Sequence, residues 1–324
     1  MSHRFYILSV DGGGYRGVFA AQLLKRMEEE WQIDWCSRFG LLAGTSTGSI
    51  LTAGLACGLP AARLADFYDA HGEAIFTPRL RSRFDVLGLF TSRYSNTQLR
   101  ALLEDTFGET TLGDVPIPLI LPAVDIDNGC VHVFKSKFHD EFVRDPKVRV
   151  SDAVLASCSA PTYFDPHFVG DYQVADGGLW ANNPSLVATI DAHYRLKIPL
   201  GDIRIISVGT GVSRAFYPRS AGKWKERLVR SWQGWGIASR WQRGKLLDLI
   251  LNLQSASAHN MLCLLLGESP RDPKRVLRLS FESDQPLPMD STHKRKEWIA
   301  KADHTFTHNA ARIADFLSLT GVPR

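Results

Sequence analysis

The sequence contains few cysteines, no long apolar run and no recognisable export signal. Its five cysteines are scattered, odd in number and lack C-x-x-C spacing, which argues against a disulfide framework and a zinc site. No stretch reaches the roughly eighteen uninterrupted apolar residues that a membrane-spanning helix needs. The amino terminus runs from Met1 into a strand-like segment, without the basic and apolar regions of a secretory signal. We therefore expect a cytoplasmic protein that holds no metal or other cofactor.

Charge is unevenly distributed along the 324 residues. The net charge is only +4, yet residues 214–245 contain nine basic residues and one acidic residue, so this segment carries about +8 and the remainder about −4. The same segment holds four tryptophans, Trp224, Trp232, Trp235 and Trp241. A slightly acidic remainder argues against general nucleic-acid binding.

Strand-like and helix-like segments alternate over most of the chain, which predicts an α/β fold with a mainly parallel central sheet. No Ser/Gly-rich linker divides the chain, so we expect one domain with added helices. The predicted strands are Arg4–Val10, Leu41–Ala43, Ile117–Val124, Val131–Phe134 and Ile203–Val208. The predicted helices are Ser49–Cys57, Thr97–Phe107, Ser151–Ser157, Ser185–Tyr194, Leu246–Leu266 and His293–Leu319, besides one that follows the first strand.

Gly44-Thr45-Ser46-Thr47-Gly48 lies between a short apolar strand and a small-residue helix. This is the nucleophile-elbow pattern, in which flanking glycines let the backbone turn tightly and the helix amino terminus faces the developing oxyanion. A bare G-x-S-x-G match is weak, but the strand before it and the helix after it favour Ser46 as a nucleophile.

A glycine-rich loop, Asp11-Gly12-Gly13-Gly14-Tyr15-Arg16-Gly17, follows the first strand and opens a helix. It lacks the Gly-Lys-Ser/Thr ending of a P-loop, and no acidic-ended second strand supports a dinucleotide site. Backbone N–H groups of Gly12, Gly13 and Gly14 would instead serve as an oxyanion hole for acyl transfer. Arg16 would fix the loop or add positive potential.

A serine nucleophile needs a general base, and none of the ten histidines has a distinctive context. Asp176-Gly177-Gly178 is more distinctive, because the carboxylate ends a short apolar stretch and is followed by two glycines. An aspartate of ordinary pKa is a weak base for an alcohol, so the surroundings of Asp176 must compensate.

These three motifs, in this order, resemble those of the patatin-like phospholipase family. The resemblance covers about residues 4 to 212 and extends to intervening segments: Ala160-Pro161-Thr162-Tyr163-Phe164, Asn182-Asn183-Pro184 and Ile206-Ser207-Val208-Gly209-Thr210-Gly211. It implies a patatin-like three-layer fold and a Ser46–Asp176 dyad that needs no histidine and no metal. It also implies oxyanion donors at Gly12 to Gly14, supported by Arg16.

The resemblance divides the chain into a catalytic core, residues 1–212, and C-terminal helical and strand additions, residues 213–324, packed on the same domain. It implies a phospholipase that cleaves fatty-acyl esters of membrane glycerophospholipids, peripheral on the inner face of the membrane when active. Residues 67–76 resemble the bacterial branch, which includes phospholipase effectors of CBASS antiphage systems that cyclic nucleotides switch on. A cyclic dinucleotide activator and a homo-oligomer are therefore further expected partners.

Two alternatives stay open at this point. An α/β-hydrolase esterase would use a histidine such as His193 or His259 in a triad. A nucleotide-sensing scaffold would keep Ser46 and Asp176 only as a vestigial site.

The basic, tryptophan-rich segment 214–245 has three interpretations. It forms a solvated helical surface with Trp232 and Trp235 packed inward, or a membrane-facing element, or a cyclic-nucleotide site. In the third case the candidate residues are Arg227, Arg230, Trp232 and Arg240.

Overall fold

The computed structural model describes residues 4–79, 91–213 and 243–319. Their centre is an eight-stranded sheet in the order β5-β6-β3-β2-β1-β7-β9, with β4 paired to β3. The strands are β1 (Phe5–Val10), β2 (Leu41–Gly44), β3 (Leu119–Asp125), β4 (Cys130–Lys135), β5 (His167–Val169), β6 (Tyr172–Asp176), β7 (Ile203–Val208) and β9 (Val276–Leu279). A small separate sheet pairs β8 (Val212–Ser213) with β10 (Glu282–Ser283).

The middle of the large sheet is parallel and one end is antiparallel. Neighbours from β3 through β2, β1 and β7 to β9 run parallel, whereas β4, β5 and β6 form antiparallel pairs. The parallel strands are largely apolar because helices cover both of their faces. The predicted α/β fold with a mainly parallel sheet is therefore confirmed.

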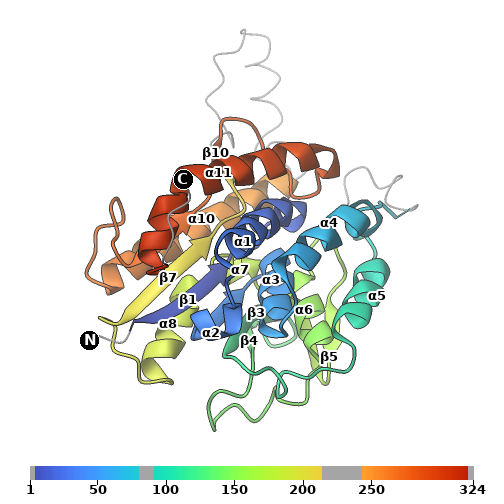
Figure 1. The fold of residues 1–324 in the computed structure, drawn as a ribbon. Helices are drawn as coiled ribbons and strands as arrows, with labels where there is room; N and C mark the ends of the chain where they lie inside the picture. Colours follow the sequence, from blue (N-terminus) through green and yellow to red (C-terminus); the bar gives the residue numbers. More distant parts are fainter. Residues whose placement is uncertain (1–3, 80–90, 214–242, 320–324) are drawn as a thin grey trace, which may run out of the picture.

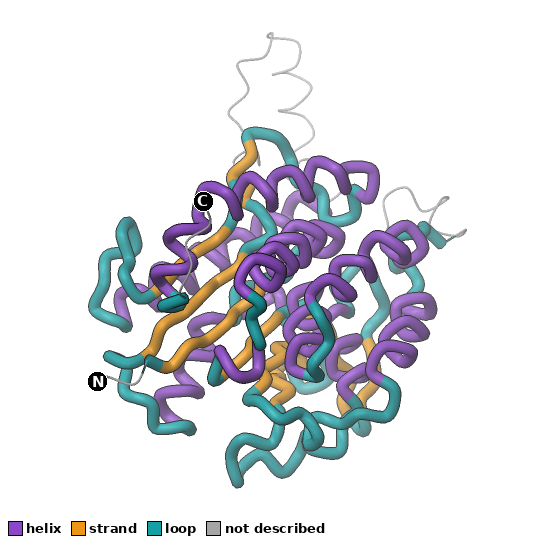
Figure 2. Tube along the Cα trace, in the orientation of Figure 1, coloured by secondary structure: helices purple, strands orange, loops and turns teal. Residues whose placement is uncertain are grey.

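Helices form a layer on each side of the sheet (Figures 1 and 2). Residues alternate between the two layers: Leu8 and Val10 join the larger apolar core, whereas Ile7 joins the smaller one. The larger core is covered by α1 (Gly17–Trp31), α3 (Thr47–Ala56), α4 (Ala61–Ile75), α5 (Asn96–Phe107), α6 (Val150–Cys158) and α11 (Arg295–Phe316). The smaller core is covered by α8 (Ser185–Tyr194) and α10 (Arg243–Leu265). The short helical elements are η1 (Gly14–Arg16), α2 (Trp35–Arg38), α7 (Gly178–Ala181) and η4 (Thr292–Lys294).

Helix α1 illustrates how sequence pattern selects the buried face. Leu23, Leu24 and Met27 are buried against the sheet side, whereas Glu29 and Glu30 are exposed, so an apolar stripe repeats at helical spacing. The C-terminal α11 packs on the same helix and also contributes a fully buried side chain, Trp298. Residues far apart in the sequence therefore share one core.

Most predicted elements are present, some with the predicted bounds. Strand β7 and helix α8 have the predicted limits, and the helix after the elbow begins at Thr47 rather than Ser49. Helix α4 and strand β9 were not predicted. Because β9 lies beyond residue 212, the C-terminal part of the chain completes the sheet; the division of the chain at that residue stays a prediction.

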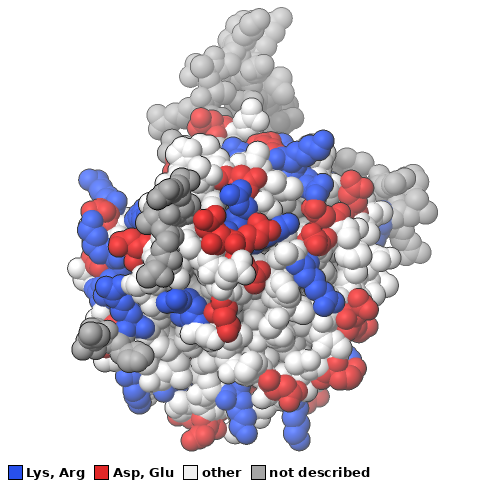
Figure 3. Space-filling model, in the orientation of Figure 1, with Lys and Arg blue, Asp and Glu red and all other residues white. Residues whose placement is uncertain are grey.

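Segment 214–245 lies outside the described residues except for its last three positions, and so do Arg227, Arg230, Trp232 and Arg240. Among the helices that the structure does describe, none is both long and apolar enough to cross a membrane. On the face drawn in Figure 3, the described basic and acidic side chains are interspersed.

Candidate active site

Ser46 occupies a strained turn between β2 and α3. Its backbone has φ 54° and ψ −126°, a region that non-glycine residues rarely adopt. The turn needs both flanking glycines, because a Cβ at Gly44 would lie 2.2 Å from the Gly48 carbonyl oxygen, and one at Gly48 would lie 2.2 Å from the Val10 oxygen. The predicted strand-turn-helix setting of Ser46 is therefore present, and the positive end of α3 lies beside its hydroxyl.

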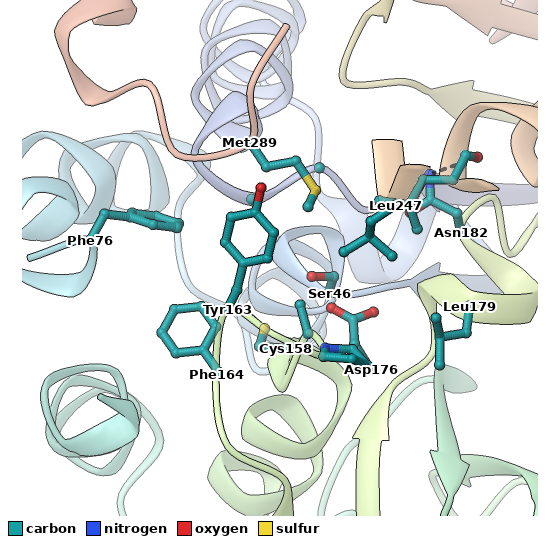
Figure 4. A pocket seen from close by; sticks show the side chains of 15 residues that line it. Ser46, Phe76, Cys158, Tyr163, Phe164, Asp176, Leu179, Asn182, Leu247 and Met289 are labelled. Carbon is teal, nitrogen blue, oxygen red and sulfur yellow. Dashed lines mark hydrogen bonds between the residues drawn. The ribbon is translucent and has the colours of Figure 1, made fainter. Parts of the chain in front are cut away.

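The sheet register explains why Ser46 lies beside Asp176. Ala43 of β2 pairs with Ile120 of β3, and Asp176 of β6 pairs with Ala123 of β3, while β4 pairs with both of these β3 residues along the other edge. Strands β2 and β6 therefore share one edge of β3 and run toward each other in opposite directions. Their carboxyl ends meet, which places the elbow serine next to the aspartate (Figure 4).

Asp176 is buried and hydrogen-bonded. The Gly178 N–H donates to its Oδ1 at 2.6 Å. Burial raises the pKa of Asp176 to about 6, while hydrogen bonds from the Ser46 hydroxyl and the Gly178 amide act in the opposite direction. A carboxylate with this pKa is largely ionised at neutral pH and is a stronger base than an ordinary aspartate. Burial of Asp176 thus offsets the weak basicity that an aspartate of ordinary pKa would have.

The three glycines of the loop have different partners. The Gly12 N–H donates to the Asn182 carbonyl at 3.0 Å, so this group is already hydrogen-bonded within the protein. Gly13 and Gly14 line the cavity that contains Ser46 and Asp176, whereas Gly12 is absent from the described lining. The Ser46 N–H is also engaged, since it donates to Ser157 Oγ at 3.0 Å. Of the predicted donors, the geometry brings Gly13 and Gly14 to the site.

Arg16 is buried and is hydrogen-bonded to the glycine loop. Its Nε donates to the Gly13 carbonyl at 3.1 Å, and its Nη1 donates to the Leu287 carbonyl at 3.0 Å. Its Nη2 lies 3.6 Å from Oδ1 of Asp248 on α10. The predicted loop-fixing role of Arg16 therefore has a structural basis, with partners from the C-terminal part of the chain.

Asp11, the first residue of the loop, is buried and forms an ion pair with the partly buried Arg278. Arg278 of β9 donates from Nη1 to Asp11 Oδ1 at 2.8 Å, and Ser255 of α10 donates to Asp11 Oδ2 at 3.0 Å. Ser255 Oγ also accepts from Asn182 Nδ2 at 2.9 Å. A network thus connects the glycine loop, α10 and the segment after Asp176.

The cavity at Ser46 is lined mainly by apolar side chains. Phe76, Tyr163 and Phe164 lie on one side of Ser46 in Figure 4, and Leu179 and Leu247 on the other. Its described lining residues are Gly13, Gly14, Ser46, Phe76, Cys158, Ala160, Pro161, Tyr163, Phe164, Asp176, Leu179, Asn182, Leu247, Leu251 and Met289. An apolar lining around a few polar groups is typical of sites that bind lipid-like ligands.

No histidine occurs among the described lining residues. His193 is exposed on α8 and faces the Ile198 carbonyl through Nδ1 at 2.8 Å. His259 lies on α10 near the Cys263 sulfur, and burial lowers its pKa. The structure therefore places neither candidate of the triad alternative at Ser46. Within residues 4–79, 91–213 and 243–319, no cluster of His, Cys, Asp or Glu has a composition suited to a metal ion.

Sequence analysis missed the roles of Asn182 and Ser157. The backbone carbonyl of Asn182 accepts from the Gly12 amide, and the position of Asn182 in Asn182-Asn183-Pro184 was a usable signal. Ser157 links the Ser46 amide to the Pro122 carbonyl, to which its Oγ donates at 2.7 Å. No local pattern distinguishes Ser157, because both partners come from distant segments.

Comparison with known proteins agrees with this geometry. The family model described as patatin-like phospholipase matches residues 8–189. A cGAMP-activated phospholipase from Pseudomonas aeruginosa is 33% identical over 82% of this chain and 76% of its own length, and one from Vibrio cholerae is 32% identical over 83% and 78%. A cUMP-AMP-activated phospholipase from Escherichia coli is 28% identical over 86% and 82%. The chain belongs to the patatin-like phospholipase family.

Proposed function

We propose that the protein hydrolyses fatty-acyl esters of membrane glycerophospholipids with Ser46 as nucleophile and Asp176 as general base. The observation that carries this proposal is the meeting of β2 and β6, which sets the Ser46 hydroxyl beside a buried carboxylate with a pKa of about 6. Family membership supports the reaction class.

In the first half-reaction, Ser46 Oγ attacks the ester carbonyl while Asp176 accepts the hydroxyl proton. The N–H groups of Gly13 and Gly14 hold the carbonyl oxygen as it becomes anionic. The C–O bond to the alcohol then breaks, and Asp176 donates its proton to the departing oxygen. In the second half-reaction Asp176 accepts a proton from water as the water oxygen attacks the acyl-serine carbonyl. The bond from the acyl carbon to Ser46 Oγ then breaks, Asp176 returns the proton to Ser46, and the fatty acid leaves.

The test uses Ser46→Ala and Asp176→Asn in fatty-acid release from phospholipid vesicles. We expect each substitution to lower the rate by about 10⁴- to 10⁶-fold, because nucleophile and base act as a unit. Ser151→Ala is the matched control, since this buried hydroxyl has no hydrogen-bond partner in the described structure. Unchanged hydrolysis in the Ser46 variant, or no fluorophosphonate adduct at Ser46, would refute the assignment.

We propose further that a cyclic nucleotide activates the enzyme in bacterial antiphage defence. The support is the naming of relatives that match over most of both chains as cGAMP- or cUMP-AMP-activated phospholipases. Fatty-acid release should rise when one member of a panel of cyclic dinucleotides is added, and no response to any member would contradict this activation. The nucleotide role of segment 214–245, homo-oligomerisation and action at the cytoplasmic face of a membrane stay predictions.

A further inference from the structure

A second apolar cavity meets the first one at Ser46. Five residues line both cavities: Gly14, Ser46, Phe76, Cys158 and Phe164. The described residues that line only the second cavity are Thr47, Ile50, Phe67, Tyr68, Gly72, Ile75 and Leu99. It therefore extends from Ser46 between α3, α4 and α5, away from the side on which Asp176 lies.

We infer that this second cavity binds the fatty-acyl chain of the ester that Ser46 attacks, and that Ile50, Phe67 and Leu99 set the chain length accepted. The inference rests on the proposed function of Ser46. Two groups diverge from an ester carbonyl, the acyl chain and the alcohol oxygen, and two cavities diverge from Ser46.

The position of Asp176 decides which group enters which cavity. Asp176 lines the first cavity and is absent from the described lining of the second. Because the departing alcohol oxygen takes its proton from Asp176, the alcohol part of the lipid must lie in the first cavity. The acyl chain is then directed into the second.

The chemistry of the second cavity suits a hydrocarbon chain. Ile50, Ile75 and Leu99 are each at most 6% exposed, so they offer only apolar surface. The hydroxyls of Tyr68 and Thr47 are hydrogen-bonded to each other, and the Tyr68 hydroxyl also donates to the Thr47 carbonyl at 3.1 Å. The side-chain hydroxyls that line only the second cavity are thus satisfied within the protein and require nothing from a ligand.

Leu99 and Leu103 provide a matched pair of substitutions on α5. Both are buried leucines one turn apart, but only Leu99 belongs to the described lining of the second cavity. Leu99→Ala should lengthen the space open from Ser46, whereas Leu103→Ala removes the same atoms from a position outside the described lining of the cavity. Ile50→Phe, on α3, should fill the cavity instead.

The experiment measures the rate at which alkyl fluorophosphonates of increasing chain length label Ser46, with and without cyclic dinucleotides. In the unsubstituted protein the rate should rise about fourfold for each methylene that enters the cavity and then level off. Leu99→Ala should move the plateau to longer chains and Ile50→Phe to shorter chains, while Leu103→Ala leaves it in place.

An unchanged plateau in both Leu99→Ala and Ile50→Phe would overturn the inference, as would an equal displacement in Leu103→Ala. If Ile50→Phe fails to fold, as judged by thermal unfolding, the Leu99 and Leu103 pair still decides. Failure of the proposed function has a different signature, since Ser46 would then be labelled by no chain length at all.

Discussion

The proposed catalytic pair, Ser46 and Asp176, and the glycine loop beside it are held in place in different ways. Ser46 and Asp176 each lie in a short sequence motif at the end of a strand, and one central strand, β3, aligns both. The glycine loop also has its own motif, but its anchors Asp248, Arg278 and Leu287 come from the last quarter of the chain. The proposed reactive groups are therefore specified locally, while the position of the proposed oxyanion donors depends on packing of distant segments.

This difference predicts how substitutions far from the site would lower activity. Damage to the C-terminal elements should misplace the loop without removing any catalytic group. A displacement of about 1 Å at an active site can lower the rate by about a hundredfold.

Arg278→Met breaks the remote anchoring and should have the largest effect on stability. Asp11 would be left charged and buried without its partner, which typically costs about 3–5 kcal/mol in the free energy of unfolding. We expect this loss in denaturant unfolding, together with a fall of about a hundredfold in kcat/KM.

The control for Arg278→Met is Lys274→Met, which removes a pair whose side chains are both about three-quarters exposed. It should change the free energy of unfolding by at most about 0.5 kcal/mol. Adding Asp11→Asn to Arg278→Met should recover part of the stability. Equal effects of the Arg278 and Lys274 substitutions would show that the loop does not depend on this anchor.

Asp176→Asn tests the part of the site that a local sequence motif specifies. The test compares the free energy of unfolding at two pH values. The pKa of Asp176 is raised from 3.8 to about 6, so the folded state binds the proton more tightly than the unfolded chain. Asp176 therefore does not lower the free energy of unfolding below pH 3.8, where it is protonated in both states. Its contribution to stability declines as the pH rises from 3.8 to 6, and above pH 6 the full cost of burying the charged carboxylate is present.

The Asn variant should therefore be more stable than the parent at pH 8 by about 3 kcal/mol, with little difference at pH 3.5, although it is inactive. Thermal unfolding at both pH values measures this. In the parent, kcat/KM should fall as the pH drops through about 6. A stability difference that is the same at both pH values would contradict a raised pKa.

Ser255→Ala has the smallest expected effect. It tests the hydrogen bonds that connect the glycine loop to the segment after Asp176. Its hydroxyl joins Asp11 to Asn182, whose carbonyl holds the Gly12 amide. Loss of these hydrogen bonds should lower the free energy of unfolding by about 1 kcal/mol and kcat/KM by roughly tenfold. Ser151→Ala serves again as the control, and a similar loss in both variants would remove Ser255 from the network.

The sequence was sufficient for those features that depend on neighbouring residues. The bounds of β7 and α8 are those that the sequence predicted, and the elbow at Ser46 follows from glycines that the turn requires. Family membership, foreseen from three motifs in order, is confirmed by the comparison.

Only the tertiary structure decided which groups meet. Strand β9 is four residues long and is stabilised by pairing with β7, which no local window contains. The engagement of the Gly12 amide and the pKa of Asp176 likewise depend on burial and on partners distant in sequence. Local sterics and periodicity act over a few residues and can be read from the chain, whereas hydrogen bonds and desolvation inside the core exist only once distant segments have packed together.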